Sequence, residues 1–189
     1  FRTQVTINIA DDPELMDLMI QAGFKGIFIG IETPDEESLL NCNKKQNTRR
    51  DLIENVKLLQ QTGFDVYAGF IVGFDSDTAD IFQKQIDFIQ DSGIVVALVN
   101  ILKAPPGTDL YDRMVREGRL HEVDLDGREG DADFVSIMGD EVLYRGYKRV
   151  VKYIYAPKNL YERTRNFLRN HETHGPMILS SRALVNDVW

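Results

Sequence analysis

The carboxylate of Glu32 stands at the end of an apolar run, in a stretch (residues 26–47) that reads GIFIGIETPDEESLLNCNKKQN. The run has the composition of a buried β-strand, and ligands of parallel α/β folds lie beyond the carboxyl ends of the strands. There a carboxylate can accept hydrogen bonds from a ribose diol or an amine. The alternative is a glutamate that caps or pairs with the helix beginning in TPDEE. Position alone leaves both interpretations open.

A second set of candidate binding residues lies in the apolar stretch YAGFIVGF, residues 67–74. Gly69 and Gly73 flank Ile71, so the backbone can approach a flat ligand closely while Ile71 packs on it. The plainer interpretation is that these glycines ease the packing of the strand against a helix. Further along, APPGT (104–108) forms a rigid turn, which on its own is a weak indication.

Strand and helix signals alternate along the first two thirds of the chain. We predict strands over about residues 3–9, 25–31, 65–72 and 94–102, of which the last three are apolar runs as in a strand covered on both faces. Two helices are expected between the second and third strands, and one in each other connection. The capping signals are Asp12 with Pro13, the capping-box-like residues 48–51, Thr78, Thr108, and the terminating glycines Gly23, Gly63, Gly93 and Gly118.

This alternation implies an α/β fold with a parallel sheet and right-handed crossovers. Four strands do not close a barrel, so the chain is either a small open sheet or part of a larger (β/α) barrel. The carboxyl ends of parallel strands meet at one edge. Asn8 and Asp11, which follow the first strand, are therefore expected near Glu32.

The chain offers little for metal or nucleophilic chemistry. Its single cysteine, Cys42, can neither build a disulfide framework nor hold a metal cluster alone. His121, His171 and His174 lack metal-ligand spacing with carboxylates or with Cys42, a site at the last two being the alternative. There is no GxGxxG, P-loop or Ser-His-Asp pattern. We predict no catalytic residue and no metal ligand in the chain.

Charge is distributed unevenly along the 189 residues, whose formal net charge is −8. Residues 144–170 hold eight Lys or Arg and one Glu, so this segment carries +7 and the remainder −15. An acidic body argues against general nucleic-acid binding. The basic segment either contacts an anionic group or docks on the acidic body, and both interpretations stay open.

Composition also indicates where the protein works. No apolar run approaches the roughly 18 residues that span a bilayer, and no signal-peptide pattern opens the chain. A single cysteine fits a reducing compartment, so we predict a cytoplasmic protein. The sequence begins at Phe1 and enters a strand at once, which favours a fragment of a longer protein.

Residues 124–133, DLDGREGDAD, have the composition of a surface connection. We therefore predict one domain over residues 1–123 and a mostly helical one over 124–189. The second domain is rich in tyrosine, and these rings are expected to pack it onto the sheet or, alternatively, to cover a substrate. They are Tyr144, Tyr147, Tyr153, Tyr155 and Tyr161.

Three stretches together resemble a known family: FIGIETPDEESLLNCNKKQN, GFDVYAGFIVGFDSDT and ILKAPPGTDLYDRMVREGRL. They resemble the later half of the radical S-adenosylmethionine (SAM) core, in the cobalamin-binding branch that includes hopanoid methylases and related B12-dependent methyltransferases. The resemblance covers about residues 3–120, and the tail looks like the helical C-terminal domain of one subgroup. It implies the later strands of a partial TIM-like barrel. In that family a CxxxCxxC loop ligates a [4Fe–4S] cluster, whose unique iron binds SAM for reductive cleavage to a 5′-deoxyadenosyl radical.

The resemblance also implies roles for residues of this chain. GIET matches the motif at the fourth barrel strand, so Glu32 would bind the SAM ribose or amino group. Asn43 and Lys44 match the family's pair of an asparagine and a basic residue, which makes Lys44 a partner for the SAM carboxylate. GFIVGF matches the fifth-strand motif, where Ile71 and its neighbours would pack on adenine. The predicted SAM-binding residues are Asn8, Glu32, Lys44, Gly69, Ile71 and Gly73.

The chain departs from the family in having no CxxxCxxC loop, no first two barrel strands and no cobalamin domain. It also has GFDSDT where many relatives have GFPGET. We expect the later half of a radical SAM enzyme, cobalamin-dependent and acting on an unidentified small molecule, with methyl transfer as one form of the chemistry. The fragment itself is expected to bind no cofactor, to be inactive and to self-associate through an exposed sheet edge. The alternatives are a stand-alone nucleotide-binding module and a protein-interaction domain without catalysis.

Overall fold

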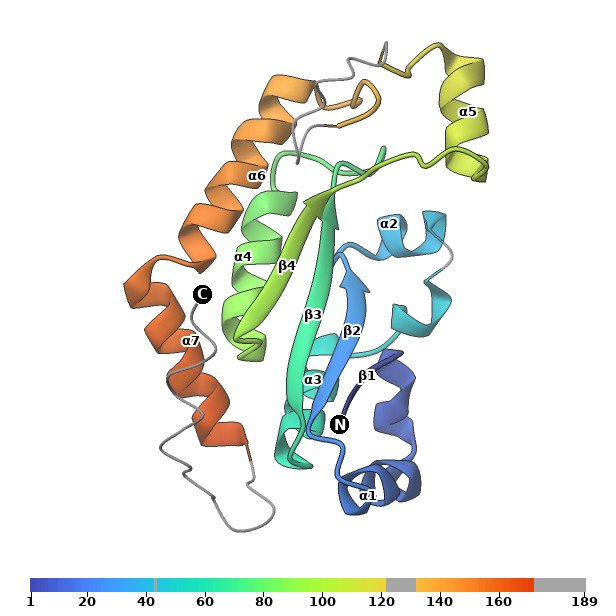
Figure 1. Ribbon diagram of the computed structural model, residues 1–189. Helices are drawn as coiled ribbons and strands as arrows, with labels where there is room; N and C mark the ends of the chain where they lie inside the picture. Colours follow the sequence, from blue (N-terminus) through green and yellow to red (C-terminus); the bar gives the residue numbers. More distant parts are fainter. Residues whose placement is uncertain (43, 122–131, 172–189) are drawn as a thin grey trace.

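A computed structural model describes residues 1–42, 44–121 and 132–171 of the chain. Within these ranges four parallel strands form one sheet in the order β1-β2-β3-β4, so each strand pairs with its neighbour in the chain (Figure 1). The strands are β1 (Arg2–Val5), β2 (Gly26–Glu32), β3 (Asp65–Val72) and β4 (Val96–Ile101). This sheet and the helices after it confirm the predicted fold class, a partial TIM-like α/β barrel.

Helices fill the connections and continue beyond the sheet; η denotes a 3₁₀ helix. Between the strands lie η1 (Ile7–Asp11), α1 (Pro13–Gln21), α2 (Glu36–Asn41), η2 (Lys45–Asn47), α3 (Leu52–Gln61) and α4 (Ile81–Ser92). After β4 come α5 (Asp109–Glu117), α6 (Asp140–Ile154) and α7 (Pro157–Asn170). In Figure 1, α4 lies behind the sheet and α6 and α7 run along its outer side, with α6 in contact with α4 and β4.

Several helix ends use the predicted capping residues. The carboxylate of Asp12 accepts the backbone N–H of Leu15 at 2.9 Å, ahead of a proline in the first turn. Thr108 Oγ1 accepts the N–H of Tyr111 at 3.2 Å and begins α5. At the other end of α5, Gly118 has a φ of 64°, the left-handed conformation that glycine adopts without steric cost.

Several predicted boundaries were wrong. The helix with Thr78 as its predicted cap begins at Ile81, with Asp80 as the N-cap residue. The first strand ends at Val5 rather than residue 9, because a 3₁₀ turn brings Ile7 and Ala10 to the same buried side. The helix predicted to begin at Thr48 begins after Asp51, whose carboxylate accepts the N–H of Glu54 at 3.0 Å. The Thr48 hydroxyl instead donates to a carbonyl of η2.

The described elements cover the sheet on one face, which corrects the prediction of strands covered on both faces. Along β3, the buried residues Val66, Ala68 and Phe70 alternate with half-buried ones. Along β4, Val96 and Leu98 are 37% and 51% exposed, whereas the residues between them are buried. Residues on the second face of the open four-stranded sheet are therefore only partly buried within the described ranges.

Two side chains attach the C-terminal helices to the sheet. The guanidinium of Arg163 is 1% exposed and donates to Gln90 Oε1 at 2.7 Å, to the carbonyl of Ile154 at 2.7 Å and to that of Val95 at 3.0 Å. The hydroxyl of Tyr155 donates to the carbonyl of Ala97 at 2.8 Å and accepts its N–H at 3.2 Å. These bonds link α6 and α7 to α4 and to the outer edge of β4.

The other tyrosines bear out the predicted packing only in part. Tyr147 packs against the main core, whereas Tyr144, Tyr153 and Tyr161 are exposed. The described ion pairs join no Lys or Arg of α6 and α7 to a carboxylate of residues 1–121, which does not support docking through ion pairs. None of the described helices has the length and apolar character needed to cross a membrane.

Candidate functional site

The end of β2 is bulged at the residue before Glu32. The β2–β3 register runs from Gly26 opposite Asp65 to Gly30 opposite Gly69, and then Glu32 lies opposite Phe70. Ile31 is thus the extra residue, and a bulge of this kind bends the strand and redirects the next side chain. Glu32 has a φ of 67°, in the left-handed region that residues with a Cβ seldom adopt. No local sequence signal indicates this irregularity.

The redirected Glu32 carboxylate lies beside Lys44. Its Oε1 is 2.8 Å from Lys44 Nζ, and the two side chains are 17% and 31% exposed. Both groups lie over Gly30, where a Cβ atom would collide with the Glu32 carboxylate and stand 3.0 Å from Lys44 Nζ. The structure therefore brings together the two charged residues of the predicted set. A half-exposed ion pair of this kind can exchange its internal contact for groups of a ligand.

Asn47 supports the end of β2 through hydrogen bonds, and it was not among the predicted site residues. Its Nδ2 donates to the carbonyls of Gly30 and Ile31, each at 3.0 Å. The residue is 2% exposed, and its Oδ1 is buried without a hydrogen-bond partner among the described residues. The only sequence signal is a polar residue two or three positions after the Asn-Lys pair, which is too common to be diagnostic.

A strip of glycine backbone runs beside the ion pair across two strands. Gly30 and Gly69 are paired in register on the uncovered face of the sheet. A Cβ on Gly69 would stand 3.1 Å from the ring of Phe28, so that ring already lies over the glycine. Ile71, two residues on, is half-buried on the same face. Side chains thus fill the space over both glycines, and a flat ligand would pack on the Phe28 ring and on Ile71 rather than on the backbone itself.

Gly73 and Asn8 lie apart from the ion pair. Gly73 has a φ of 102°, its N–H donates to Asp77 Oδ2 at 2.8 Å, and an added Cβ would meet Leu143 of α6. Its contacts are thus with a turn and a helix. Asn8 is exposed in η1, and its described side-chain hydrogen bond comes from the Thr6 hydroxyl.

The two aspartates of GFDSDT have separate partners. Asp77 is 6% exposed and accepts the N–H groups of Gly73 and Phe74 and the hydroxyl of Ser38, which ties α2 to the turn after β3. Burial raises the pKa of its carboxyl to about 6. Asp75 pairs with Arg119 at 2.7 Å, and this ion pair raises the pKa of that guanidinium. These contacts hold the segments around α2 and α5 at the carboxyl end of β3.

Metal chemistry finds no support in the part of the chain that the structure describes. There, no group of three or more His, Cys, Asp or Glu side chains has the arrangement to hold a metal ion. His121 lies 3.2 Å from Asp140 and His171 3.4 Å from Asp65. Burial raises the pKa of the half-buried Cys42 thiol, which disfavours the thiolate that a metal requires. His174 and Asn43 lie outside the described residues.

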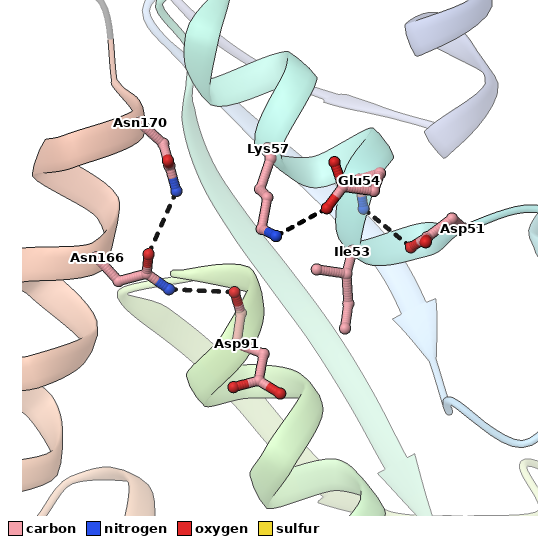
Figure 2. A pocket seen from close by; sticks show the side chains of 7 residues that line it. All are labelled: Asp51, Ile53, Glu54, Lys57, Asp91, Asn166 and Asn170. Atoms are coloured by element: carbon pink, nitrogen blue, oxygen red, sulfur yellow. Dashed lines mark hydrogen bonds and ion pairs between the residues drawn. The ribbon is translucent and has the colours of Figure 1, made fainter.

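A hollow of about 510 Å³ lies between α3, α4 and α7, on the helical side of the sheet (Figure 2). Its polar groups largely bond one another: Asp51 caps the N–H of Glu54, Glu54 pairs with Lys57, and Asn166 donates to the carbonyl of Asp91. Asp91 belongs to the last turns of α4, at the opposite end of that helix from the turn after β3. The hollow is therefore separate from the candidate site.

Two segments of the chain match known protein families. Residues 1–89 match the radical SAM superfamily, and residues 108–186 match a domain of unknown function (DUF4070). Residues 1–89 thus carry a radical SAM domain, as the resemblance led us to expect, and the second match agrees with the subgroup expected from the tail. The division at residues 123 and 124 stays a prediction.

Curated relatives carry the same similarity. The chain is 38% identical over 160 residues to a hopanoid C-2 methylase of Rhodopseudomonas palustris, covering 85% of the chain and 30% of the relative. It is 39% identical over 138 residues to an uncharacterized methyltransferase of Synechocystis sp., covering 73% and 25%. A bacteriochlorophyllide d C-12(1)-methyltransferase of Chlorobaculum tepidum is 27% identical over 126 residues, covering 67% and 27%. The chain thus spans 25% to 30% of the length of these relatives.

Proposed function

We propose that this chain is the later part of a radical SAM core and that, within the whole protein, it contributes the SAM-binding residues at the carboxyl ends of β2 and β3. The observation that carries the proposal is the Glu32–Lys44 ion pair, which lies over Gly30 beside the Gly30–Gly69 strip. The whole protein is proposed to be a cytoplasmic, cobalamin-dependent methyltransferase of a small molecule. The relatives' names share methyl transfer and differ in substrate, so the substrate is not carried over.

The residues present fit SAM. The Glu32 carboxylate accepts hydrogen bonds from the ribose hydroxyls or the amino group, and Lys44 pairs with the carboxylate of SAM. The glycine strip makes room for the Phe28 ring and for the Glu32–Lys44 pair, and the adenine is proposed to pack on Phe28 and Ile71. When bound, SAM supplies a sulfonium whose carbon–sulfur bond can be cleaved reductively. The role of this chain is to bind and orient it.

The residues present do not fit the [4Fe–4S] cluster. The chain holds a single cysteine, Cys42, whereas the cluster takes several thiolates. The thiolates must therefore come from another part of a longer protein, and this chain alone is proposed not to cleave SAM. No described residue is assigned to cobalamin.

Replacement of Glu32 tests the proposal in the full-length enzyme, prepared anaerobically. Glu32→Ala should abolish 5′-deoxyadenosine formation after reduction with SAM, while the fold survives. Glu54→Ala is the matched control, because Glu54 forms an equivalent pair with Lys57 at 2.8 Å in α3, away from the strand ends. An unchanged deoxyadenosine yield in Glu32→Ala would remove the proposed role of Glu32.

A further inference from the structure

Asn47 makes an unusual pair of contacts with the end of β2. Its single amide nitrogen donates to two successive strand carbonyls, those of Gly30 and Ile31, at 3.0 Å each. In a regular strand successive carbonyls point to opposite sides, so one donor group cannot reach both. The bulge at Ile31 brings the two oxygens to the same side. The amide of Asn47 and the bulge therefore depend on each other.

The bulge in turn sets the backbone of Glu32. The left-handed φ of 67° is disfavoured for a residue with a Cβ, and such a conformation persists only where the surroundings hold it. Asn47 supplies two bonds to the residues before Glu32, and the N–H of Thr33 adds a third to the Ile31 carbonyl at 2.9 Å. From this backbone the Glu32 carboxylate turns back over Gly30 to meet Lys44.

Stability alone gives a poor account of an asparagine in this position. Its Oδ1 is buried and without a partner among the described residues, and an unpaired buried acceptor lowers stability. An apolar side chain of similar size would avoid that loss. It could not, however, donate to the two carbonyls. What distinguishes asparagine here is the paired donor group under the bulge.

We infer that Asn47 is a positioning residue for SAM, because it holds the bulge that aims the Glu32 carboxylate at the ligand. This inference rests on the proposed function, in which Glu32 binds SAM. Asn47 itself lies beneath the strand, 2% exposed, and acts through Glu32. Replacement of Asn47 should therefore weaken SAM binding when residue 32 is glutamate, and should have no further effect when Glu32 has been replaced.

A double-mutant cycle tests this dependence in the full-length, cluster-loaded enzyme, with the dissociation constant of SAM measured by equilibrium dialysis. Asn47→Ala and Glu32→Gln should each weaken binding about tenfold, as expected for the loss of one or two hydrogen bonds. The double variant should bind no more weakly than Glu32→Gln alone. If Asn47→Ala does not fold, Asn47→Ser, which retains one donor, replaces it in the same cycle.

Gln60→Ala is the matched control for a general loss of stability. Gln60 is also buried and donates through Nε2 to the carbonyl of Ser92 at 3.1 Å, and its Oε1 has no partner in the described part of the chain, but it lies at the far end of α3. Its replacement should lower the melting temperature and leave the dissociation constant of SAM unchanged.

Two results would overturn the positioning role of Asn47 and leave the proposed role of Glu32 intact. One is unchanged SAM binding in Asn47→Ala while Glu32→Gln binds weakly. The other is an equal loss of affinity from Asn47→Ala with and without Glu32→Gln, which would mean that Asn47 acts through the fold. If Glu32→Gln binds SAM as tightly as the unmodified enzyme, the proposed function of Glu32 fails and this inference fails with it.

Discussion

Asp77 is a buried carboxyl group whose ionisation opposes folding. Burial raises its pKa from 3.8 to about 6, although it accepts hydrogen bonds from two backbone N–H groups and from Ser38. Between these pH values the folded chain holds a proton that the unfolded chain has lost. Stability from this group therefore falls as the pH rises, and the loss is complete above pH 6. Each pH unit between the two pKa values contributes roughly 1.4 kcal/mol, which gives about 3 kcal/mol.

Asp77→Asn removes the ionisation and keeps the shape of the side chain. Its amide oxygen can still accept the N–H groups of Gly73 and Phe74, and its nitrogen can donate to the Ser38 hydroxyl. The free energy of unfolding of the variant, relative to the unmodified chain, should rise by about 2 kcal/mol between pH 4 and pH 7.5, since part of the change already occurs below pH 4. Urea unfolding followed by circular dichroism at each pH measures this difference.

Asp87→Asn, at an exposed position of α4, serves as the control and should leave the shape of the pH profile unchanged. Parallel pH profiles for Asp77→Asn and the unmodified chain would show that burial does not raise the pKa of the Asp77 carboxyl. A variant that loses stability more at pH 7.5 than at pH 4 would refute the reasoning in sign, because the ionised carboxylate would then stabilise the turn.

Further predictions concern the attachment of the C-terminal helices. Arg163→Lys should lower the free energy of unfolding by about 3 kcal/mol in urea titrations, because a lysine cannot reach the three acceptors of the planar guanidinium. Tyr155→Phe should lower the free energy of unfolding by about 1–2 kcal/mol, because it removes the two hydrogen bonds to Ala97. The same variant leaves the edge of β4 unpaired there, so light scattering should detect stronger self-association. The unmodified chain should also self-associate, through β1; a strict monomer at all concentrations would contradict this.

The regular parts of the fold could be predicted from local sequence. The bounds of β3 were predicted in full, since its apolar run has a turn signal at each end. Asp12 and Thr108 were recognised as caps because capping depends on residues three positions apart. The charged half of the site, Glu32 with Lys44, was predicted from placement and family resemblance, and the structure brings the two side chains together.

The supporting half of the site could not be predicted in this way. The bulge at Ile31 is a property of the register between β2 and β3, which no single stretch of sequence contains. Asn47 reaches carbonyls 16 and 17 positions earlier in the chain, so its role depends on how η2 packs. The contact of Gly73 with α6 likewise joins segments that are far apart in the sequence.

The order of the strands has a consequence for how the chain is made. Each strand pairs with the one before it, so the loop closed by each pairing is one connection of one to three helical segments. Short loops are quick to close, and chains fold from the amino-terminal side as they leave the ribosome. The sheet can therefore grow one strand at a time on an edge that is always the newest. The free edge of β4 is covered at Ala97 only after α6 has formed, because the hydroxyl that pairs with it belongs to Tyr155 at the end of that helix.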